Sequence, residues 1–402
     1  MKSDENFDKI LFVSTFPPRE CGIATFTKDL SDAIDNQPSL EKISKILAIN
    51  NNGINIYNYP KAVVYQISDN DINGYIETAK QINNSESIKL VSIQHEFGIF
   101  GGELGDHLLA FLEVLNKPTT VTFHSILPKP TKRRKDVVKA IANRVNEIVV
   151  MTPTGVKILE QDYQISTPIR VIPHGIPDIN FEPQIDEKIN LGLYNYTILS
   201  SFGLLNPSKG YEYVIAALPE IIEKYPNILY LIVGETHPIL RAKEGEKYRN
   251  FLEKKIKSLN LQRHVKFYNK YITKEEITQY LKATDIYISP SLTKDQITSG
   301  TLVNAMGCGR AVISTPFIHA RDTITGENGL LVEFKNSKSF TEKILELLED
   351  KQKIKNIEIK AFHQTRSMTW KNVAKTYNQM FNNILTTPIH TPIIKTLPYN
   401  SA

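Results

Sequence analysis

The chain of 402 residues is too long for one ordinary hydrophobic core, so its length predicts two or three domains. Its content of 41% hydrophobic and 23% charged residues is typical of a soluble globular protein, and it has no apolar run long enough to span a membrane. The net charge of +5 is too small to indicate a nucleic-acid binder, and two cysteines are too few for a disulfide framework.

The first residues carry acids where a secretory signal would place a basic and then an apolar segment, so we expect a cytoplasmic protein. Basic residues gather instead within 129–139. The first interpretation of this cluster is a solvated helix start. The alternative is peripheral contact with anionic lipid on the inner membrane face, or with a phosphorylated acceptor. Its members are Lys129, Lys132, Arg133, Arg134, Lys135 and Lys139.

In the first half, runs rich in Val and Ile alternate with helical segments. Such runs, without polar alternation, are typical of strands buried on both faces of a parallel sheet. Helices are expected at 23–34 and 104–115. The expected strands are 9–15, 62–68, 88–96, 119–125, 147–153 and 169–175.

The pattern lapses in 177–195, a polar segment with prolines that we interpret as a linker. The second half then repeats the alternation and ends with two amphipathic helices and a proline-containing tail without periodicity. Its expected strands are 196–203, 228–234, 264–270, 285–290 and 310–316. Its expected helices are 211–225, 248–259, 274–283, 336–350 and 370–385.

Strands that alternate with helices predict an α/β fold with a doubly wound parallel sheet in each half. The predicted domains are 1–180 and 181–366, followed by a helix, 367–386, that crosses back to the first domain, and a tail, 387–402. Ligands of such sheets bind beyond the carboxyl ends of the strands. We therefore expect a cleft in which the strand-to-helix loops of both halves face each other.

In the first half, Gly22 precedes a helix start that could bind an anion, although a plain structural turn is an equal interpretation. The loop is neither a Walker loop nor a GxGxxG fingerprint, which argues against a dinucleotide. The glycine-rich loop after strand 88–96 holds His95, Glu96 and Gly98. His124 ends the next strand, where it could contact a sugar hydroxyl or be a structural histidine.

In the second half, Lys209 stands beside Gly210 at a strand-to-helix junction, a suitable place for a cation that binds a diphosphate. The segment DQITSGTL places Ser299, Gly300 and Thr301 at a helix start, where small residues expose N–H donors. No Cys/His cluster has metal-ligand spacing and no DxD pair follows a strand, so no metal is expected.

Together these loops resemble those of the retaining glycosyltransferases of the GT-B fold in family 4, the glycosyl transferases group 1. The resemblance covers about 9–385. It rests on five segments in the family's order and spacing: PPRECGIATFT, FGLLNPSKG, DIYISPS, SGTLVNAMGCGRAVIST and ENGLLV. It implies two facing Rossmann-like domains, with a nucleotide-diphosphosugar donor on the C-terminal domain and the acceptor on the N-terminal side.

The resemblance also implies residue roles. Lys209 corresponds to the family's diphosphate-binding lysine, and Asn304 to a residue that holds the ribose. The residues implied in catalysis are His124, Lys209 and Gln296. Those implied in donor binding are Arg19, Gly22, Lys209, Glu235, His237, Arg241, Tyr271, Ser299, Gly300, Thr301 and Asn304. Those implied on the acceptor side are His95, Glu96 and Gly98.

Three positions depart from the family pattern. The family's arginine, five positions before the lysine, is Leu204, and its two helix glutamates are Gln296 and Asn304. Amides keep hydrogen-bonding capacity but lose charge, and charge-assisted bonds are roughly twice as strong as neutral ones. We therefore expect an active site with altered donor handling. The missing cation is expected to come from Arg19, Arg241 or Arg321.

The sequence thus predicts a metal-independent hexosyltransferase that uses a UDP- or GDP-sugar and acts on a glycan, a lipid-linked or a small hydroxyl acceptor. Retention needs no positioned nucleophile if the leaving diphosphate helps to deprotonate the acceptor. Two alternatives stay open. One is a glycoside phosphorylase or sugar-nucleotide epimerase on the same fold, and the other is a catalytically silent scaffold.

Overall fold

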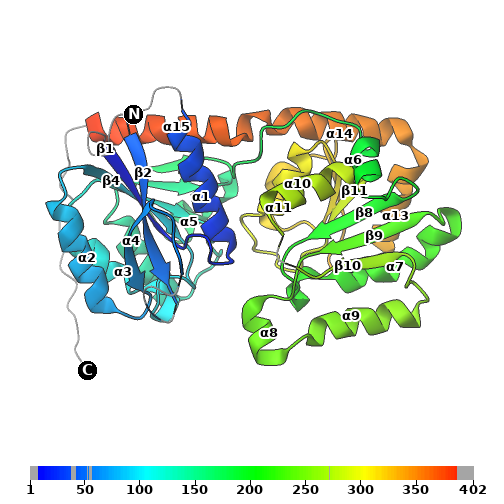
Figure 1. Ribbon diagram of the computed structural model, residues 1–402, viewed down its shortest axis with the longest axis horizontal. Coiled ribbons are helices and arrows are strands. Elements are labelled where there is room, and N and C mark those ends of the chain that lie inside the picture. The colour runs from blue at the N-terminus through cyan, green and yellow to red at the C-terminus, as the bar shows by residue number, and fades with distance from the viewer. Residues whose placement is uncertain (1–7, 38–41, 52, 54–56, 271, 387–402) are drawn as a thin grey trace. The chain divides into compact units, whose positions relative to one another are not determined.

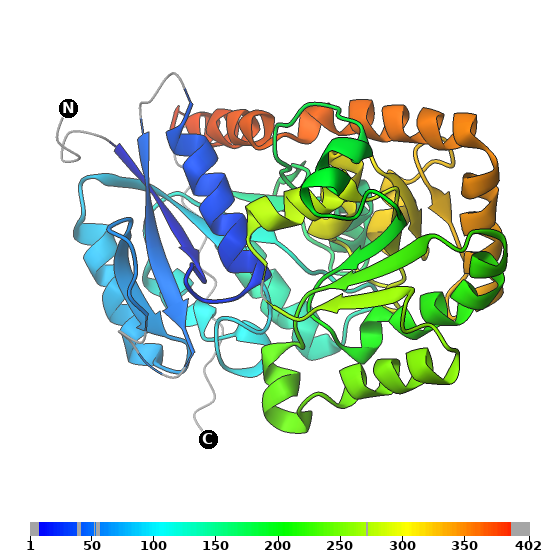
Figure 2. The ribbon, with the colours of Figure 1, turned by 45° about the vertical axis from the view of Figure 1, so that its right-hand side comes forward.

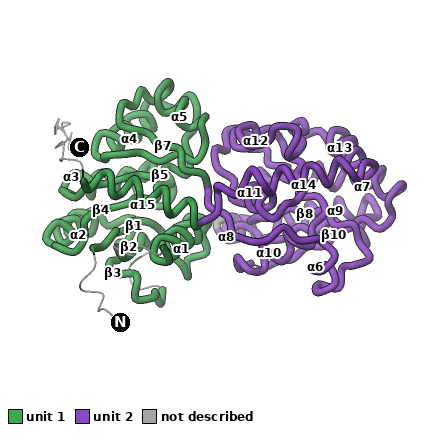
Figure 3. Tube along the Cα trace, turned by 90° about the horizontal axis from the view of Figure 1, so that it is seen from above, with its two compact units in different colours: residues 1–173, 371–402 green, residues 174–370 purple. Residues whose placement is uncertain are grey.

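The computed structural model describes residues 8–37, 42–51, 53, 57–270 and 272–386 (Figure 1). The chain forms two compact units (Figure 3). The first unit combines Met1–Pro173 with Lys371–Ala402, and the second is His174–Trp370. Within the described residues, no helix is both long and apolar enough to cross a bilayer.

The first unit contains a seven-stranded sheet with the order β3-β2-β1-β4-β5-β6-β7, in which every neighbouring pair is parallel. Ile10 to Val13 of the central strand β1 are fully buried, as a strand with helices on both faces must be. The strands are β1 (Asp8–Ser14), β2 (Lys42–Asn50), β3 (Val63–Ser68), β4 (Ile88–His95), β5 (Thr119–Phe123), β6 (Glu147–Val150) and β7 (Ile169–Val171).

Helices cover both faces of this sheet, and α1 runs beside β1 and β2 (Figure 2). Asp71, Thr131 and Thr152 begin three of them, because each side chain accepts a hydrogen bond from a backbone N–H of the first turn. The helices are α1 (Gly22–Asp35), α2 (Ile72–Asn84), η2 (Glu103–Gly105), α3 (Leu108–Val114), α4 (Lys132–Ala142), α5 (Pro153–Gln161) and α15 (Trp370–Thr386).

The last helix, α15, packs on the first unit although it begins only at Trp370. The hydroxyl of Tyr377 lies 3.0 Å from that of Thr122 on β5. The ring of Phe381 contacts Phe12 of β1 edge-on, with 6.4 Å between centroids. Tyr377 and Phe381 are both buried, so this helix contributes to the core of the first unit.

The second unit contains a six-stranded sheet with the order β10-β9-β8-β11-β12-β13, also parallel throughout. Its strands are β8 (Thr197–Phe202), β9 (Ile228–Val233), β10 (Val265–Tyr268), β11 (Ile286–Ser289), β12 (Ala311–Ser314) and β13 (Leu330–Leu331). Its helices are α6 (Gln184–Asn190), η3 (Pro207–Lys209), α7 (Tyr211–Lys224), α8 (Pro238–Glu244), α9 (Lys247–Ser258), α10 (Lys274–Ala283), α11 (Gly300–Gly307), α12 (Ile318–Thr323), α13 (Ser337–Glu349), α14 (Lys351–Thr365) and η4 (Arg366–Met368).

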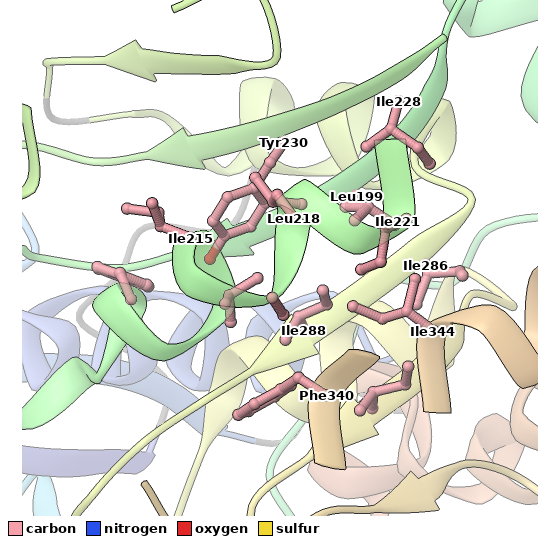
Figure 4. Packing of buried hydrophobic residues seen from close by; sticks show 14 of the residues in the cluster. Leu199, Ile215, Leu218, Ile221, Ile228, Tyr230, Ile286, Ile288, Phe340 and Ile344 are labelled. Carbon is pink, nitrogen blue, oxygen red and sulfur yellow. The ribbon is translucent and has the colours of Figure 1, made fainter. Parts of the chain in front are cut away.

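Alternate strand residues of the second unit enter two separate cores. Leu199, Tyr230 and Ile288 pack with α7 and α13 on one face (Figure 4). Their neighbours Ile198, Leu229 and Tyr287 pack with α10, α11 and α12 on the other. Apolar burial on both faces explains why these strands lack polar alternation. The prediction of a doubly wound parallel sheet in each half is therefore confirmed.

The structure differs from the sequence-based elements in the segment interpreted as a linker, 177–195, which contains α6. Lys188 of this helix donates hydrogen bonds to Asp285 and to the carbonyl of Tyr196, at 2.6 and 3.0 Å. These bonds attach α6 to the second unit, so the segment is part of that unit's surface.

The first unit also ends earlier than the predicted boundary at 180. Ile176 donates to the carbonyl of Met368, and Trp370 donates back to the carbonyl of Ile176. A Cβ on Gly175 would lie 2.2 Å from the ring of Trp370. The segment after Pro173 is thereby paired with 368–370 and belongs to the second unit. The predicted tail, 387–402, lies outside the described residues.

Candidate functional site

The strand order of the second unit reverses between β8 and β11, which is where doubly wound sheets bind ligands. The loops after β8 and β9 meet there, and Leu205 pairs with Thr236. Gly203 and Gly234 have φ angles of 132° and 140°. A Cβ on Gly234 would lie 2.3 Å from the carbonyl oxygen of Gly203, so only glycine allows this approach of the two backbones.

Lys209 lies at this switch point, as the sequence predicts. It ends the 3₁₀ turn η3, which Asn206 begins by accepting a hydrogen bond from the N–H of Ser208. Its Nζ lies 3.3 Å from the position that a Cβ of residue 203 would take. Lys209 makes no ion pair with any residue that the structure describes. Burial lowers the pKa of Lys209, because loss of solvent disfavours its charged form.

A second polar group without a partner lies beside this lysine. The hydroxyl of Tyr211 is 4.0 Å from the same Cβ position of Gly203. It is fully buried and has no hydrogen-bond partner among the described residues. Burial also raises the pKa of Tyr211, so the phenol stays protonated and keeps its donor.

Helix α11 begins at the same edge of the sheet, after β11. Ser299 caps it by accepting a hydrogen bond from the N–H of Leu302 at 3.4 Å. The N–H of Ser299 donates to Nδ1 of His319 at 2.7 Å. The N–H groups of Gly300 and Thr301 lie in the first helical turn, where no intrahelical acceptor exists. The helix start therefore offers two backbone donors to a ligand.

The two amide positions of this helix and its loop differ in their surroundings. Both polar atoms of Gln296 are used within the loop, since Oε1 accepts from Ser291 at 2.9 Å and Nε2 donates to the carbonyl of Thr298 at 3.0 Å. Asn304 instead has a buried Oδ1 without a partner in the described part of the chain. Asn304 lies one turn beyond Gly300 on the same face of α11, so its oxygen is a candidate acceptor for a ligand hydroxyl.

The loop after β9 holds Glu235, His237 and Arg241, three of the predicted donor-binding residues. Nη1 of Arg241 donates to Oε2 of Glu235 at 2.9 Å, so this arginine already has a carboxylate partner. Oε1 of Glu235 and Nδ1 of His237 are buried without partners among the described residues. Tyr271, also predicted to bind the donor, lies outside the described residues.

In the first unit, Gly22 is the first residue of α1, and a Cβ there would meet no atom within 4 Å. Nη1 of Arg19 donates to the carbonyl of Ile49 at 3.0 Å, which ties this arginine to the end of β2. Arg321, the third candidate for the missing cation, is exposed on α12 of the second unit. Leu204 lies in the loop after β8, near Lys209 in sequence but without charge.

The structure corrects the prediction for His95. Its side chain is 0% exposed, and both ring nitrogens lack partners in the described part of the chain. Its ring packs against Phe97, Phe100 and Phe123, with centroid distances between 5.0 and 5.6 Å. His95 ends β4 with its side chain directed into the core, because alternate strand residues point to opposite faces. It is therefore a core residue rather than an acceptor contact.

The neighbouring acceptor-side candidates lie closer to the surface. Gly98 is exposed, with open space where a Cβ would be. Glu96 accepts hydrogen bonds from Ser125 at 2.6 Å and from the N–H of Phe97 at 3.1 Å. Burial raises the pKa of Glu96, and these bonds oppose that rise. The carboxyl group is thus held in place at the carboxyl edge of the first sheet.

His124 is nearly buried at the end of β5. Its Nε2 lies 3.0 Å from Oε1 of Gln94, and its ring meets Phe26 edge-on, with 4.6 Å between centroids. These contacts fit the structural interpretation of this histidine. A role toward the donor sugar stays a prediction.

The basic cluster of 129–139 runs from the loop before α4 to Lys139 in its last turn, and the first turn of the helix contains no acid. Cations are unfavourable at this end of a helix, so the arrangement gains from a bound anion. Arg133 forms ion pairs with Asp106 and Glu103. Arg134 instead lies over the ring of Phe97, at 5.2 Å from its centroid. Within the described residues, no three His, Cys, Asp or Glu side chains are grouped as metal ligands.

Two residues of this site were not among the sequence-based candidates. Tyr211 follows Lys209 by two positions, and His319 follows the end of β12. Both stand in strand-to-helix connections of the predicted sheet, so the rule that selected Lys209 also applies to them. The hydrogen bond of His319 to Ser299 joins loops that are distant in the sequence, and the burial of the Tyr211 hydroxyl depends on packing, so no local pattern reveals either feature.

Comparison with known proteins adds family information. The model of the family "Glycosyl transferases group 1" matches residues 184–364. An uncharacterized glycosyltransferase of Methanocaldococcus jannaschii is 25% identical over 258 residues, which are 62% of this chain and 62% of that protein. A phosphatidyl-myo-inositol mannosyltransferase of Propionibacterium freudenreichii is 24% identical over 56% of this chain. The matched regions thus span 62% and 52% of the length of these two relatives.

Solved structures match almost the whole chain. Sucrose-phosphate synthase of Thermosynechococcus elongatus aligns with a TM-score of 0.73 at 18% identity, over 94% of this chain and 99% of that one. HepE of Anabaena, solved in complex with UDP, aligns with a TM-score of 0.73 at 17% identity, over 93% and 100%. These matches confirm the predicted GT-B fold with its two Rossmann-like domains.

Proposed function

Because residues 184–364 match the model of the glycosyl transferases group 1 family, we propose that the protein transfers a hexosyl group from a nucleotide-diphosphosugar to a hydroxyl acceptor. Relatives named as mannosyltransferases and structural neighbours solved with UDP and with UDP-glucose support this proposal. The donor is a UDP- or a GDP-sugar, since one relative is named as dependent on GDP-mannose.

The observation that carries the proposal is the cation of Lys209 at the switch point of the second sheet, which has no ion-pair partner among the described residues. A diphosphate placed there would give this ammonium the anion it lacks and restore its pKa. The N–H groups of Gly300 and Thr301 would add donors at the positive end of the α11 dipole. The Oδ1 atom of Asn304 would accept a hydrogen bond from a ribose hydroxyl.

The mechanism that we propose retains the configuration of the sugar and needs no metal. The bond from the anomeric carbon to the diphosphate breaks, and a bond to the acceptor oxygen forms on the same face. The acceptor proton passes to an oxygen of the leaving diphosphate. Lys209 and the helix start stabilise the charge on that group as it leaves. The amides of Gln296 and Asn304 cannot act as nucleophiles or bases, so the leaving group itself takes the proton.

The acceptor would bind at the carboxyl edge of the first unit, near the carboxyl group of Glu96 and the open space beside Gly98. The basic start of α4 would bring an acceptor on an anionic lipid surface to this edge. The relatives named for phosphatidylinositol acceptors support a lipid-linked acceptor over a small soluble one.

A silent binding protein is the second candidate. Leu204 removes the family's arginine, and both polar atoms of Gln296 form hydrogen bonds within its own loop. Both functions predict nucleotide binding, but only a transferase releases nucleoside diphosphate from the sugar nucleotide.

The test is a thermal-shift panel of UDP, GDP and their glucose, galactose, mannose and N-acetylglucosamine conjugates, followed by detection of released nucleoside diphosphate. A ligand at about one hundred times its Kd stabilises the folded state by about 2.7 kcal/mol. We expect either the uridine or the guanosine ligands to raise the melting temperature of the protein. We also expect the protein to hydrolyse the corresponding sugar nucleotide slowly when no acceptor is present. A stabilising sugar nucleotide that is neither hydrolysed nor transferred to membrane lipid extracts would favour the silent protein. No stabilisation by any member would contradict both.

A further inference from the structure

The loop between β11 and α11, residues 290–299, has no regular secondary structure, so its shape depends on specific hydrogen bonds. Gln296 supplies two of them, as acceptor from Ser291 and as donor to the carbonyl of Thr298. A backbone carbonyl can only accept, so only an amide at this position makes both bonds. A glutamate would place a carboxylate oxygen against the carbonyl of Thr298.

His319 of α12 holds the same segment at both of its ends. Its backbone N–H donates to the carbonyl of Gln296 at 3.0 Å, and its Nδ1 accepts from the N–H of Ser299 at 2.7 Å. The side chain is only 2% exposed. Burial lowers the pKa of His319 to about 4, so its ring is neutral at pH 7 and the Nδ1 lone pair is available. The segment 296–299 is thus fixed from within by Gln296 and from α12 by His319.

We infer that Gln296 and His319 are positioning residues that aim the free N–H groups at the start of α11, and that Gln296 does not contact the donor sugar. The inference rests on the proposed function, because it concerns the binding of the donor diphosphate. His319 occupies the N–H of Ser299, and the hydroxyl of Ser299 occupies that of Leu302. The donors of Gly300 and Thr301 are left for the ligand.

The amide at position 296 therefore has a structural role, the positioning of the start of α11, that a glutamate would not fulfil. A residue that contacts the sugar affects only ligands that carry a sugar. A residue that positions the helix start affects the nucleoside diphosphate itself. This difference separates the two roles of Gln296 by binding measurements alone.

The first test substitutes Gln296→Met, which keeps the length of the side chain, removes both hydrogen bonds and adds no charge. Isothermal titration calorimetry measures the Kd of UDP, GDP, UDP-glucose and GDP-mannose for the wild-type protein and the variant. For the base that the wild type binds, we expect the Kd of the nucleoside diphosphate and of its sugar nucleotide to rise by the same factor, about tenfold.

The second test uses His319, where the conservative variant restores the acceptor. His319→Asn can present an amide oxygen near the place of Nδ1, so we expect Kd values within about threefold of the wild type. His319→Phe lacks an acceptor, and we expect about a tenfold rise in Kd. Thr293→Ala, in the exposed part of the same loop, is the matched control and should leave binding unchanged. Thermal unfolding without ligand identifies any variant that fails to fold.

The outcomes are distinct. If the wild-type protein binds neither UDP nor GDP, the proposed function is wrong and the inference falls with it. If the wild type binds and Gln296→Met weakens only the sugar nucleotides, Gln296 is a sugar contact and the inference alone is wrong. Unchanged binding of all four ligands by folded Gln296→Met and His319→Phe would also overturn it. The inference is supported if the affinity for nucleoside diphosphates and for sugar nucleotides falls by the same factor and if His319→Asn restores it.

Discussion

At the scale of single residues, the proposed chemistry depends mainly on the charge of Lys209, which has no ion-pair partner in the part of the chain that the structure describes. A cation that is half-buried without an anion is costly, and it is retained where a ligand supplies the missing charge. The buried hydroxyl of Tyr211 and the open face of Gly203 lie at the same place. Three different groups thus converge on one point at the end of β8.

We predict that Lys209→Met lowers the rate of sugar transfer by about a hundredfold or more, because one lost electrostatic contact to a developing charge typically costs about 2.7–4 kcal/mol. Methionine keeps much of the side-chain volume, so the fold should be preserved. Turnover is measured by release of nucleoside diphosphate. Lys224→Met is the matched control, since Lys224 forms only a surface ion pair with Glu349. Undiminished turnover in Lys209→Met would contradict the assigned role.

The buried imidazole of His95 has a consequence for stability rather than for catalysis. Burial lowers the pKa of His95 from 6.5 to about 3. The unfolded chain therefore binds a proton below pH 6.5 that the folded chain binds only near pH 3. Stability from this group is complete above pH 6.5 and is lost as the pH falls toward 3. Between pH 7 and pH 5 the loss is about 2 kcal/mol.

His95→Phe should remove this dependence, because phenylalanine does not titrate and suits a cage of aromatic rings. We expect the difference in unfolding free energy between pH 7 and pH 5 to shrink by about 2 kcal/mol relative to the wild type. Urea denaturation at both pH values measures this difference, whatever the change in absolute stability. Phe381→Leu, whose buried ring packs against Phe12 and Tyr377, is the control and should keep the wild-type dependence. An unchanged difference in His95→Phe would show that His95 does not titrate as proposed.

At the scale of elements, the strands β8 to β12 of the second unit could be predicted from the sequence, whereas β13 and the helices α6, α8, α12 and α14 were not predicted. Its strands are apolar on both faces, so β-branched runs such as β9 stand out clearly. Strand β2 could not be recognised in this way, because Lys42, Ser44 and Lys45 interrupt its apolar residues. Ser44 is nonetheless buried, and its N–H donates to Asp35 of α1 at 2.8 Å. A tertiary bond thus satisfies a residue that looks exposed in the sequence.

The candidate site could be predicted from the sequence only where it depends on local features. The position of Lys209 follows from the end of a strand and the start of a helix, which are local features. The engagement of Gln296 and the burial of His95 depend on which face each side chain takes and on what lies opposite. Those facts come from packing between distant segments, so sequence patterns locate the loops at the strand ends but not the orientation of each side chain.

Arg310 shows how one buried side chain connects elements of the second unit. Its guanidinium donates hydrogen bonds to the carbonyl oxygens of Cys308, Lys282 and Glu182, at 2.8, 3.1 and 3.0 Å. These carbonyls belong to the end of α10, the turn after α11 and the segment that leads into α6. Arginine suits this task because its donors have a fixed planar geometry.

We predict that Arg310→Met lowers the unfolding free energy by about 2–4 kcal/mol, because several buried carbonyl groups lose their donors together. Arg310→Lys keeps the charge but has fewer donor directions, so its unfolding free energy should lie between those of the wild type and Arg310→Met. Chemical denaturation followed by circular dichroism measures the change. Lys254→Met on the exposed face of α9 is the control and should stay within about 0.5 kcal/mol of the wild type. A variant Arg310→Met as stable as the wild type would show that the bonds only offset the desolvation of the charge.

At the scale of the whole molecule, the two units carry different kinds of polar group at the carboxyl edges of their sheets. The second unit offers an unpaired lysine and two helix-start donors, which suit a phosphate-bearing donor. The first unit offers a fixed carboxyl group at Glu96 and a basic helix start at α4. This difference between the units is the reason why we propose donor binding on the second unit and acceptor binding on the first.

We predict that the protein binds vesicles containing phosphatidylserine and that binding weakens as salt rises, because the α4 cluster acts through long-range attraction. Lys132→Ala with Lys135→Ala should reduce vesicle affinity by about tenfold or more, at about 1 kcal/mol for each base near an anionic surface. Sedimentation with phosphatidylserine vesicles at two salt concentrations measures the vesicle affinity. Neutral phosphatidylcholine vesicles serve as the lipid control. Lys254→Ala with Lys257→Ala on α9 removes the same charge from the second unit and should leave binding unchanged. Equal losses in both double variants would indicate a response to net charge, and no loss in the α4 variant would assign the cluster to a solvated helix start.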